Sequence, residues 1–243
     1  MKLTYTEDFK IACKINNLKH EELLQYYIDH VSFYAFIGGE TDLVYHWANQ
    51  VNIECEKIFD GVTDEHVNDS IQKIILKYVK QLAGLSINDK LSKEDKIESS
   101  VVIMKAWSIE MIPLINYERQ FNIGDGHLLD LTFDFNLLCR VNGISLTQSL
   151  QWFIDNISLA RERSINLLET VKTNPSMAVL LLVIISNNEI KDKIMPHQEI
   201  YKKYGLQLLK LDKKQRQEPN IRERTNVYSA FYSDWYNTLN SMN

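Results

Sequence analysis

Two segments of this chain match when one of them is shifted by 126 residues. The first is FKIACKINNLKHEELLQYYIDHVS, from Phe9 to Ser32, and the second is FNLLCRVNGISLTQSLQWFIDNIS, from Phe135 to Ser158. Eight of the 24 aligned positions are identical, whereas ordinary residue usage gives about one or two by chance. We interpret the pair as an internal repeat, so any fold for this chain has to contain the same local unit twice.

Each copy has the pattern of a short helix, a turn and a second helix. Asn16-Asn17 and Asn142-Gly143 follow the short helices, and Asn and Gly tolerate the left-handed conformation that closes a helix. Ser145 and Gln148 have the spacing of a capping box for the second helix. That helix has apolar residues at i, i+3, i+4 and i+7, which predicts a buried stripe. The stripe residues are Leu24, Tyr27, Ile28 and Val31, matched by Leu150, Phe153, Ile154 and Ile157.

A different face of the second helix carries polar residues that are identical in the two copies. They are Gln25, Asp29 and Ser32, matched by Gln151, Asp155 and Ser158. Core packing does not explain identity on a face outside the core. One explanation is structural, either a Gln–Asp bond along the helix or a contact between the copies. The other is a shared binding face, and these six residues are our candidate binding residues.

The rest of the chain predicts a mostly helical, bundle-like globule with at most short strands. Eight Gly and four Pro are few for 243 residues, and few breakers favour long helices. Caps and apolar spacing predict the further helices. They cover residues 41–59, 63 to about 82, 92–112, 177–185 and 219–239, and the second helix of copy two is extended through 161–171.

The Gly-rich residues 122–126 predict a linker between two halves. The first half, 1–126, contains copy 9–32, and the second, 127–243, contains copy 135–158; alternatively, the halves form one compact domain. Lys2–Thr6 and Leu128–Thr132 alternate weakly as strands, each before one copy.

Nothing in the sequence predicts export or insertion into a membrane. The N-terminus lacks the apolar run of a signal peptide, and Met177–Ile185 is too short to span a bilayer. Three cysteines without an export signal suggest reduced thiols. Cys13 and Cys139 match between the copies among Ile and Leu, which predicts buried packing. We therefore expect a cytoplasmic protein with no membrane partner.

Positive charge is concentrated near the C-terminus, although the net charge is −5. Residues 202–224 hold eight cations against three anions. This excess attracts an anionic partner, or it is simply a solvated basic face. The candidate anion-contacting residues are Lys202, Lys203, Lys210, Lys213, Lys214 and Arg216.

No motif for catalysis, metal binding or cofactor binding stands out. The six histidines form no HExxH, and CxxC, phosphate-loop and GxSxG patterns are missing from the sequence. We predict no metal and no cofactor. His46 with Glu54 or Glu56 is the pair that would best suit an unrecognised site.

The order of strand, helix, Asn-containing turn and helix resembles the ribbon–helix–helix DNA-binding unit. The resemblance covers Lys2–Ser32 and Leu128–Ser158. It implies that the strands of two units pair into a ribbon that enters the major groove. Two copies in one chain would then pair with each other.

Three functions follow from these patterns. The favoured hypothesis is a non-enzymatic protein that acts through protein–protein contacts, with a protein partner or by self-association. The second is a DNA-binding regulator that uses the repeated unit and the basic segment. The third is an enzyme with an unrecognised site.

Overall fold

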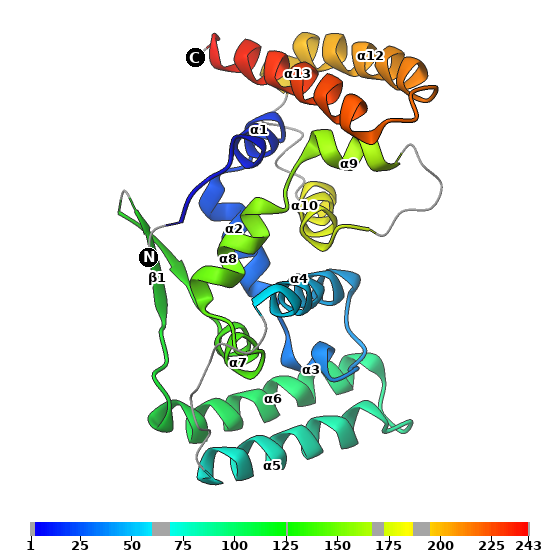
Figure 1. Cartoon of the computed structure of the whole chain (residues 1–243). Coiled ribbons are helices and arrows are strands. Elements are labelled where there is room, and N and C mark those ends of the chain that lie inside the picture. The colour runs from blue at the N-terminus through cyan, green and yellow to red at the C-terminus, as the bar shows by residue number, and fades with distance from the viewer. Residues whose placement is uncertain (1–2, 60–68, 125, 167–172, 187–194, 243) are drawn as a thin grey trace. The chain divides into compact units, whose positions relative to one another are not determined.

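A computed structural model describes residues 3–59, 69–124, 126–166, 173–186 and 195–242. Within these ranges the chain forms twelve α-helices, two short 3-10 helices and one two-stranded antiparallel sheet (Figure 1). The expectation of a mostly helical fold with at most short strands is confirmed. The predicted helix start at residue 63 lies outside the described residues.

The chain divides into two compact units, and each unit combines residues from both halves of the sequence. Unit 1 comprises Met1–Leu3 and Leu24–Trp152, and unit 2 comprises Thr4–Leu23 and Phe153–Asn243. The boundaries between them fall inside α2 (His20–Asp29) and α8 (Leu146–Asp155). Neither unit ends near residue 126.

The remaining elements belong to one unit each. Unit 1 contains α3 (Phe33–Phe36), α4 (Leu43–Phe59), α5 (Asp69–Ser86), α6 (Lys93–Met111), η1 (Ile112–Leu114), β1 (Gln120–Gly124), β2 (His127–Asp130) and α7 (Phe133–Val141). Unit 2 contains α1 (Glu7–Ile15), α9 (Leu159–Asn166), α10 (Pro175–Ser186), η2 (Met195–His197), α12 (Gln198–Gln215) and α13 (Ile221–Asn240).

A β-hairpin occupies the place where the sequence suggested a linker. β1 and β2 pair with Gln120 opposite Asp130. Gly124 and Gly126 have φ angles of +100° and +81°, which glycine adopts without steric cost. The linker prediction for residues 122–126 is therefore wrong for the four described residues. Residue 125 lies outside the described residues. A tight turn and a flexible linker favour the same residue types, so composition does not separate them.

The pairing of β2 differs from the ribbon that the DNA-binding resemblance implies. β2 pairs with β1, its neighbour in the sequence. The first expected strand is wrong over its described part, because residues 3–6 are irregular.

The two matching segments form the same elements, with bounds that differ by 126 residues. α1 corresponds to α7, and α2 corresponds to α8. Thr6 and Thr132 cap the first helices through hydrogen bonds from Phe9 N and Phe135 N, of 3.2 and 3.1 Å. The turns that follow contain left-handed residues, as expected. They are Asn17 at φ +51° and Gly143 at φ +64°. Duplication as the origin of this likeness stays a prediction.

The second helix of the later copy ends earlier than we expected. α8 stops at Asp155, and α9 begins after Ser158, whose Oγ accepts a hydrogen bond from Arg161 N at 3.1 Å. The predicted extension of this helix through 161–171 is therefore wrong over 161–166, because a serine cap begins a separate helix there. Residues 167–171 lie outside the described residues. All eight residues of the predicted apolar stripes are nevertheless buried, as expected.

Each unit has its own aromatic core. In unit 1, the fully buried Trp107 stacks on Tyr78 at 5.4 Å and meets Phe33 edge-on at 5.0 Å. In unit 2, α12 and α13 lie side by side, and Tyr204 stacks on Trp235 at 5.2 Å (Figure 1). No described helix combines the length and apolar character that crossing a bilayer requires.

Candidate functional site

The predicted polar face makes structural contacts at Gln25. Its Nε2 donates to Asp29 Oδ1 at 2.8 Å, which confirms the bond expected along the helix. The same side-chain amide also binds the backbone of Asp130. Nε2 donates to the carbonyl oxygen of Asp130, and Oε1 accepts from its N–H, both at 2.9 Å. Gln25 thus binds β2 as a neighbouring strand would.

The other five predicted binding residues are divided between helix caps and surface positions. Ser32 caps α3 by accepting from Ala35 N at 3.3 Å, in the way that Ser158 caps α9. Asp29 and Asp155 are exposed, and Gln151 is partly exposed. Gln25, Asp29, Ser32 and Gln151 belong to unit 1, whereas Asp155 and Ser158 belong to unit 2. A binding role for these six residues stays a prediction.

All six predicted anion-contacting residues have exposed side chains. Five of them lie on α12, and Arg216 is its C-terminal cap residue. Lys203 Nζ lies 5.2 Å from the ring centre of Tyr204. These six side chains are therefore solvated, and what they bind stays a prediction.

Unit 1 contains an apolar groove of about 790 Å³ that the sequence did not reveal. This volume falls within the range typical of ligand-binding sites. Eight of its eleven lining residues are apolar. Helix α5 supplies Ile71, Gln72, Ile75 and Leu76; α6 and the segment after it supply Met111, Leu114, Ile115 and Asn116; α7 supplies Leu137, Arg140 and Val141.

The rim of this groove is unusually exposed for apolar side chains. Leu76, Leu114 and Val141 are 57%, 49% and 44% exposed. Single exposed apolar residues are ordinary on protein surfaces, but a cluster around a hollow is typical of a binding surface. The groove and its rim therefore form our first candidate surface.

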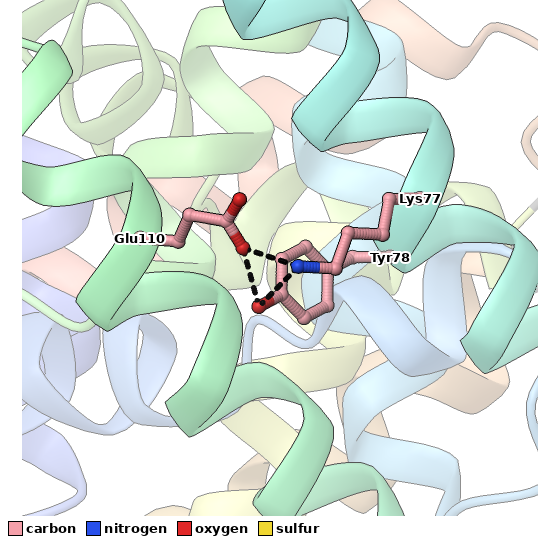
Figure 2. Close-up of polar contacts among 3 residues, drawn as sticks. All are labelled: Lys77, Tyr78 and Glu110. Atoms are coloured by element: carbon pink, nitrogen blue, oxygen red, sulfur yellow. Dashed lines mark hydrogen bonds and ion pairs between the residues drawn. The ribbon is translucent and has the colours of Figure 1, made fainter.

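A polar clamp fixes α5 against α6 beside the groove (Figure 2). Lys77 Nζ and Tyr78 OH both donate to Glu110 Oε2, at 2.5 and 2.8 Å. Lys77 follows Leu76 in the chain, and Glu110 precedes Met111. The clamp thus joins the turn of α5 and the turn of α6 that line the groove.

Burial and hydrogen bonding set the proton affinities in this clamp. Burial, and then the bond to the Glu110 carboxylate, raises the pKa of Tyr78. The hydrogen bond from Lys77, and then that from Tyr78, lowers the pKa of Glu110. Near neutral pH, Glu110 is therefore charged and Tyr78 is a neutral donor. Because Lys77 and Glu110 are exposed, their ion pair stabilises little and serves mainly to position the helices.

Helix α6 also exposes a second apolar surface, which we call the α6 stripe. It consists of Val102, Ala106 and Ile109, at i, i+4 and i+7 on one helix face. Val102 and Ile109 are each 69% exposed. The opposite face of α6 is buried and includes Met104 and Trp107. A helix of a globular protein normally has one apolar face towards the core, so the α6 stripe is our second candidate surface.

The chemistry of the groove suits binding rather than catalysis. Its described lining has no carboxylate, histidine, cysteine or hydroxyl group that could move a proton or attack a substrate. No group of three potential metal ligands is found among the described residues. Gln72, Asn116 and Arg140 are the polar lining groups, and they can orient a bound partner.

The cysteines are buried free thiols, as the sequence predicted for Cys13 and Cys139. Burial raises the pKa of both and raises that of Cys55 to about 12. All three are therefore protonated and unreactive near neutral pH. His46, the centre of the enzyme hypothesis, is exposed and packs its ring against Trp47 at 5.1 Å.

Comparisons with protein families, with curated proteins and with solved structures give no match. Functional inference for this chain therefore rests on its own residues.

The sequence could have revealed the α6 stripe but not the groove. Val102, Ala106 and Ile109 have helical spacing opposite a second apolar set, and this two-sided pattern is visible in the printed sequence. The groove combines three elements that lie far apart in the chain, so periodicity within one element carries no signal for it.

Proposed function

We propose that this chain is a non-catalytic protein that acts through protein–protein contacts, and that unit 1 binds a second copy of the same chain. The observation that carries the proposal is the pair of apolar surfaces on unit 1. One is concave, the groove, and the other is convex, the α6 stripe. In the proposed pair, the stripe of each copy enters the groove of the other.

The exposed rim favours a protein partner over a small molecule. A small ligand inside the groove would leave Leu76, Leu114 and the α6 stripe in contact with water. A protein surface covers the rim and the stripe together, and each square ångström of apolar surface removed from water stabilises the complex by about 25 cal/mol. Residues at i, i+4 and i+7 on a helix are also the usual anchors for an apolar groove.

The complementary shapes favour a second copy as that partner. A single unit presents both the groove and the helix face that fits such a groove. In a twofold dimer, the same contact occurs twice, so both surfaces on both copies are covered and the assembly closes. The lack of acid–base groups in the described groove lining supports contact rather than chemistry as the purpose of this surface.

Sedimentation velocity tests this proposal directly. We would study the wild type, Ile109→Glu in the stripe and Leu76→Glu in the groove. The concentrations run from about 1 µM to about 100 µM, where many interfaces of standard size dissociate. The wild type is expected to approach twice the 28.5 kDa chain mass. Each variant is expected to weaken the dimer by at least about tenfold, because a carboxylate would enter an apolar contact.

Leu206→Glu is the matched control. Leu206 is 54% exposed on α12 of unit 2, so this variant adds the same charge at a similar surface position outside the proposed interface. It is expected to dimerise like the wild type, and circular dichroism verifies that all variants keep their helices. A wild type that stays monomeric throughout, or a control as defective as Ile109→Glu, would overturn the proposal.

A further inference from the structure

Arg224 in unit 2 is a buried cation whose side chain has no hydrogen-bond partner among the described residues. It lies in the first turn of α13, and its side chain is 1% exposed. Within the described ranges of the chain, neither Nε nor Nη2 has a hydrogen-bond partner. A guanidinium stays charged in proteins, and an uncompensated buried charge is strongly unfavourable. Arg224 therefore calls for an anion.

The acidic side chain in the last turn of α12, Asp212, is already engaged. Asp212 accepts two hydrogen bonds from Arg163, through Nε at 3.0 Å and through the terminal nitrogen. Its Oδ1 also accepts the Tyr228 hydroxyl at 2.9 Å. Glu218, in the turn between α12 and α13, accepts from Asn220 N at 2.9 Å. Neither carboxylate has a hydrogen bond to Arg224.

Gln215, the last residue of α12, has a hydrogen-bond acceptor that lacks a donor among the described residues. It is buried, and its carbonyl oxygen Oε1 has no hydrogen-bond partner in the part of the chain that the structure describes. The start of α13 thus has donor atoms on Arg224, and the end of α12 has an acceptor atom on Gln215, that lack hydrogen-bond partners among the described residues. Exposed cations around the same turn raise the local concentration of anions. They are Lys213, Lys214, Arg216 and Arg222.

We propose that the α12–α13 turn of unit 2 binds a small oxyanion that retains one proton at neutral pH, namely hydrogen phosphate. The oxygens of the anion accept from Arg224, and its hydroxyl group donates to Gln215 Oε1. The near-complete burial of Arg224 favours a small anion. The phosphates of a nucleic acid belong to a bulky polymer that cannot enter a buried site. This site is independent of the dimer contact proposed for unit 1.

Thermal unfolding of the full chain with inorganic phosphate tests this proposal. The Tm would be followed at increasing phosphate, with sodium chloride and sodium sulfate at the same ionic strength as references. We expect phosphate to raise the Tm of the wild type more than either reference does, because ligands that bind only the folded state stabilise it. Sulfate carries no proton at neutral pH and cannot donate to Gln215. Glycerol phosphate, a monoester whose second pKa is about 6, mostly carries no proton at neutral pH and is a further reference in a parallel series.

Variants assign the effect to the two buried residues. Arg224→Met keeps the length of the side chain and removes the charge, and it is expected to weaken phosphate binding at least about tenfold in calorimetric titration. Gln215→Met is expected to reduce the preference for phosphate over sulfate. Lys105→Met removes an exposed cation from α6 in unit 1, outside the proposed site, and is expected to leave the affinity for phosphate unchanged.

Three results would overturn the proposal, and the first needs no variant. In the first, phosphate raises the Tm of the wild type no more than chloride does. In the second, sulfate raises the Tm as much as phosphate does. In the third, the Arg224→Met variant binds phosphate as tightly as the wild type.

Discussion

Asp134 shows how a single half-buried carboxylate links stability to pH. Its Oδ1 accepts the Phe33 N–H at 2.9 Å at the start of α3, and burial raises its pKa from 3.8 to about 6. Between these values the folded protein holds a proton that the unfolded chain releases. The free energy of unfolding therefore falls as the pH rises from about 4 to about 6.

Asp134→Asn is expected to remove this dependence while it keeps an oxygen to accept from Phe33. The variant should gain stability relative to the wild type by about 2 kcal/mol between pH 4 and pH 7. Urea unfolding at several pH values measures the difference. Parallel stability curves for the two proteins would contradict the prediction.

Replacing glycine by alanine is expected to have opposite effects on stability at Gly143 and at Gly205. Gly143 has a φ of +64°, so Gly143→Ala is expected to destabilise the protein by about 1 kcal/mol. Gly205 lies inside α12, and no atom lies within 4 Å of the position that a Cβ would take. Gly205→Ala is expected to stabilise by about 0.5–1 kcal/mol. The urea midpoints of the two variants show whether each is stabilised or destabilised. Midpoints that move in the same direction would contradict the prediction.

At the residue scale, local turn and cap signals and the burial of apolar residues were predictable, whereas the burial of a charged residue was not. The left-handed turns at Asn17 and Gly143 and the Ser145–Gln148 capping box are set by residues within a few positions of each other. Arg224 was grouped with a solvated charge run, yet it is buried. Its position four residues before Tyr228 places it on the apolar stripe of α13, and that spacing was the available signal.

Helix α6 is the element on which the proposed interface depends most. Its N-terminus is closed by a capping box, in which Asp95 N donates to Ser92 Oγ at 3.1 Å and Ser92 N donates to Asp95 Oδ2 at 3.3 Å. Ser92 and Asp95 have the sequence spacing of a capping box, and the structure shows both of its hydrogen bonds.

Ser92→Ala is expected to lower the free energy of unfolding by about 1 kcal/mol, because an N-terminal donor of α6 loses its partner. Ser99→Ala, inside the same helix, serves as the control. It is expected to be neutral or slightly stabilising, since alanine has the higher helix propensity. Equal losses in both variants would show that the cap contributes nothing of its own.

The helices themselves were largely predictable, whereas their ends were less so. α4, α6, α10 and α13 lie close to their expected ranges because apolar spacing and caps act locally. The break at Ser158 escaped notice, since the apolar stripe passes through Ile157 without losing its period. A cap and a mid-helix serine look alike until the backbone is known.

At the scale of the whole molecule, each of the two units contains residues from both halves of the chain. α1 comes from the first half and packs in unit 2, where Ile11 and Ile15 join the cluster of Tyr204 and Trp235. α7 comes from the second half and packs in unit 1. Such exchange depends on contacts between distant residues, and no pattern within a segment encodes it. The groove was unpredictable for the same reason.

The proposed dimer joins a concave surface to a convex one, and mixing two defective chains tests that claim most directly. Ile109→Glu keeps an intact groove, and Leu76→Glu keeps an intact α6 stripe. Each variant alone is expected to sediment as a monomer at about 10 µM, since both contacts of its dimer contain a carboxylate.

In a mixture, the groove of one chain can still receive the stripe of the other. With one variant fluorescently labelled, sedimentation of the equimolar mixture is expected to reveal a heterodimer that is weaker than the wild-type dimer, because one of its two contacts is intact. A mixture that stays monomeric while the wild type dimerises would contradict the pairing of stripe with groove.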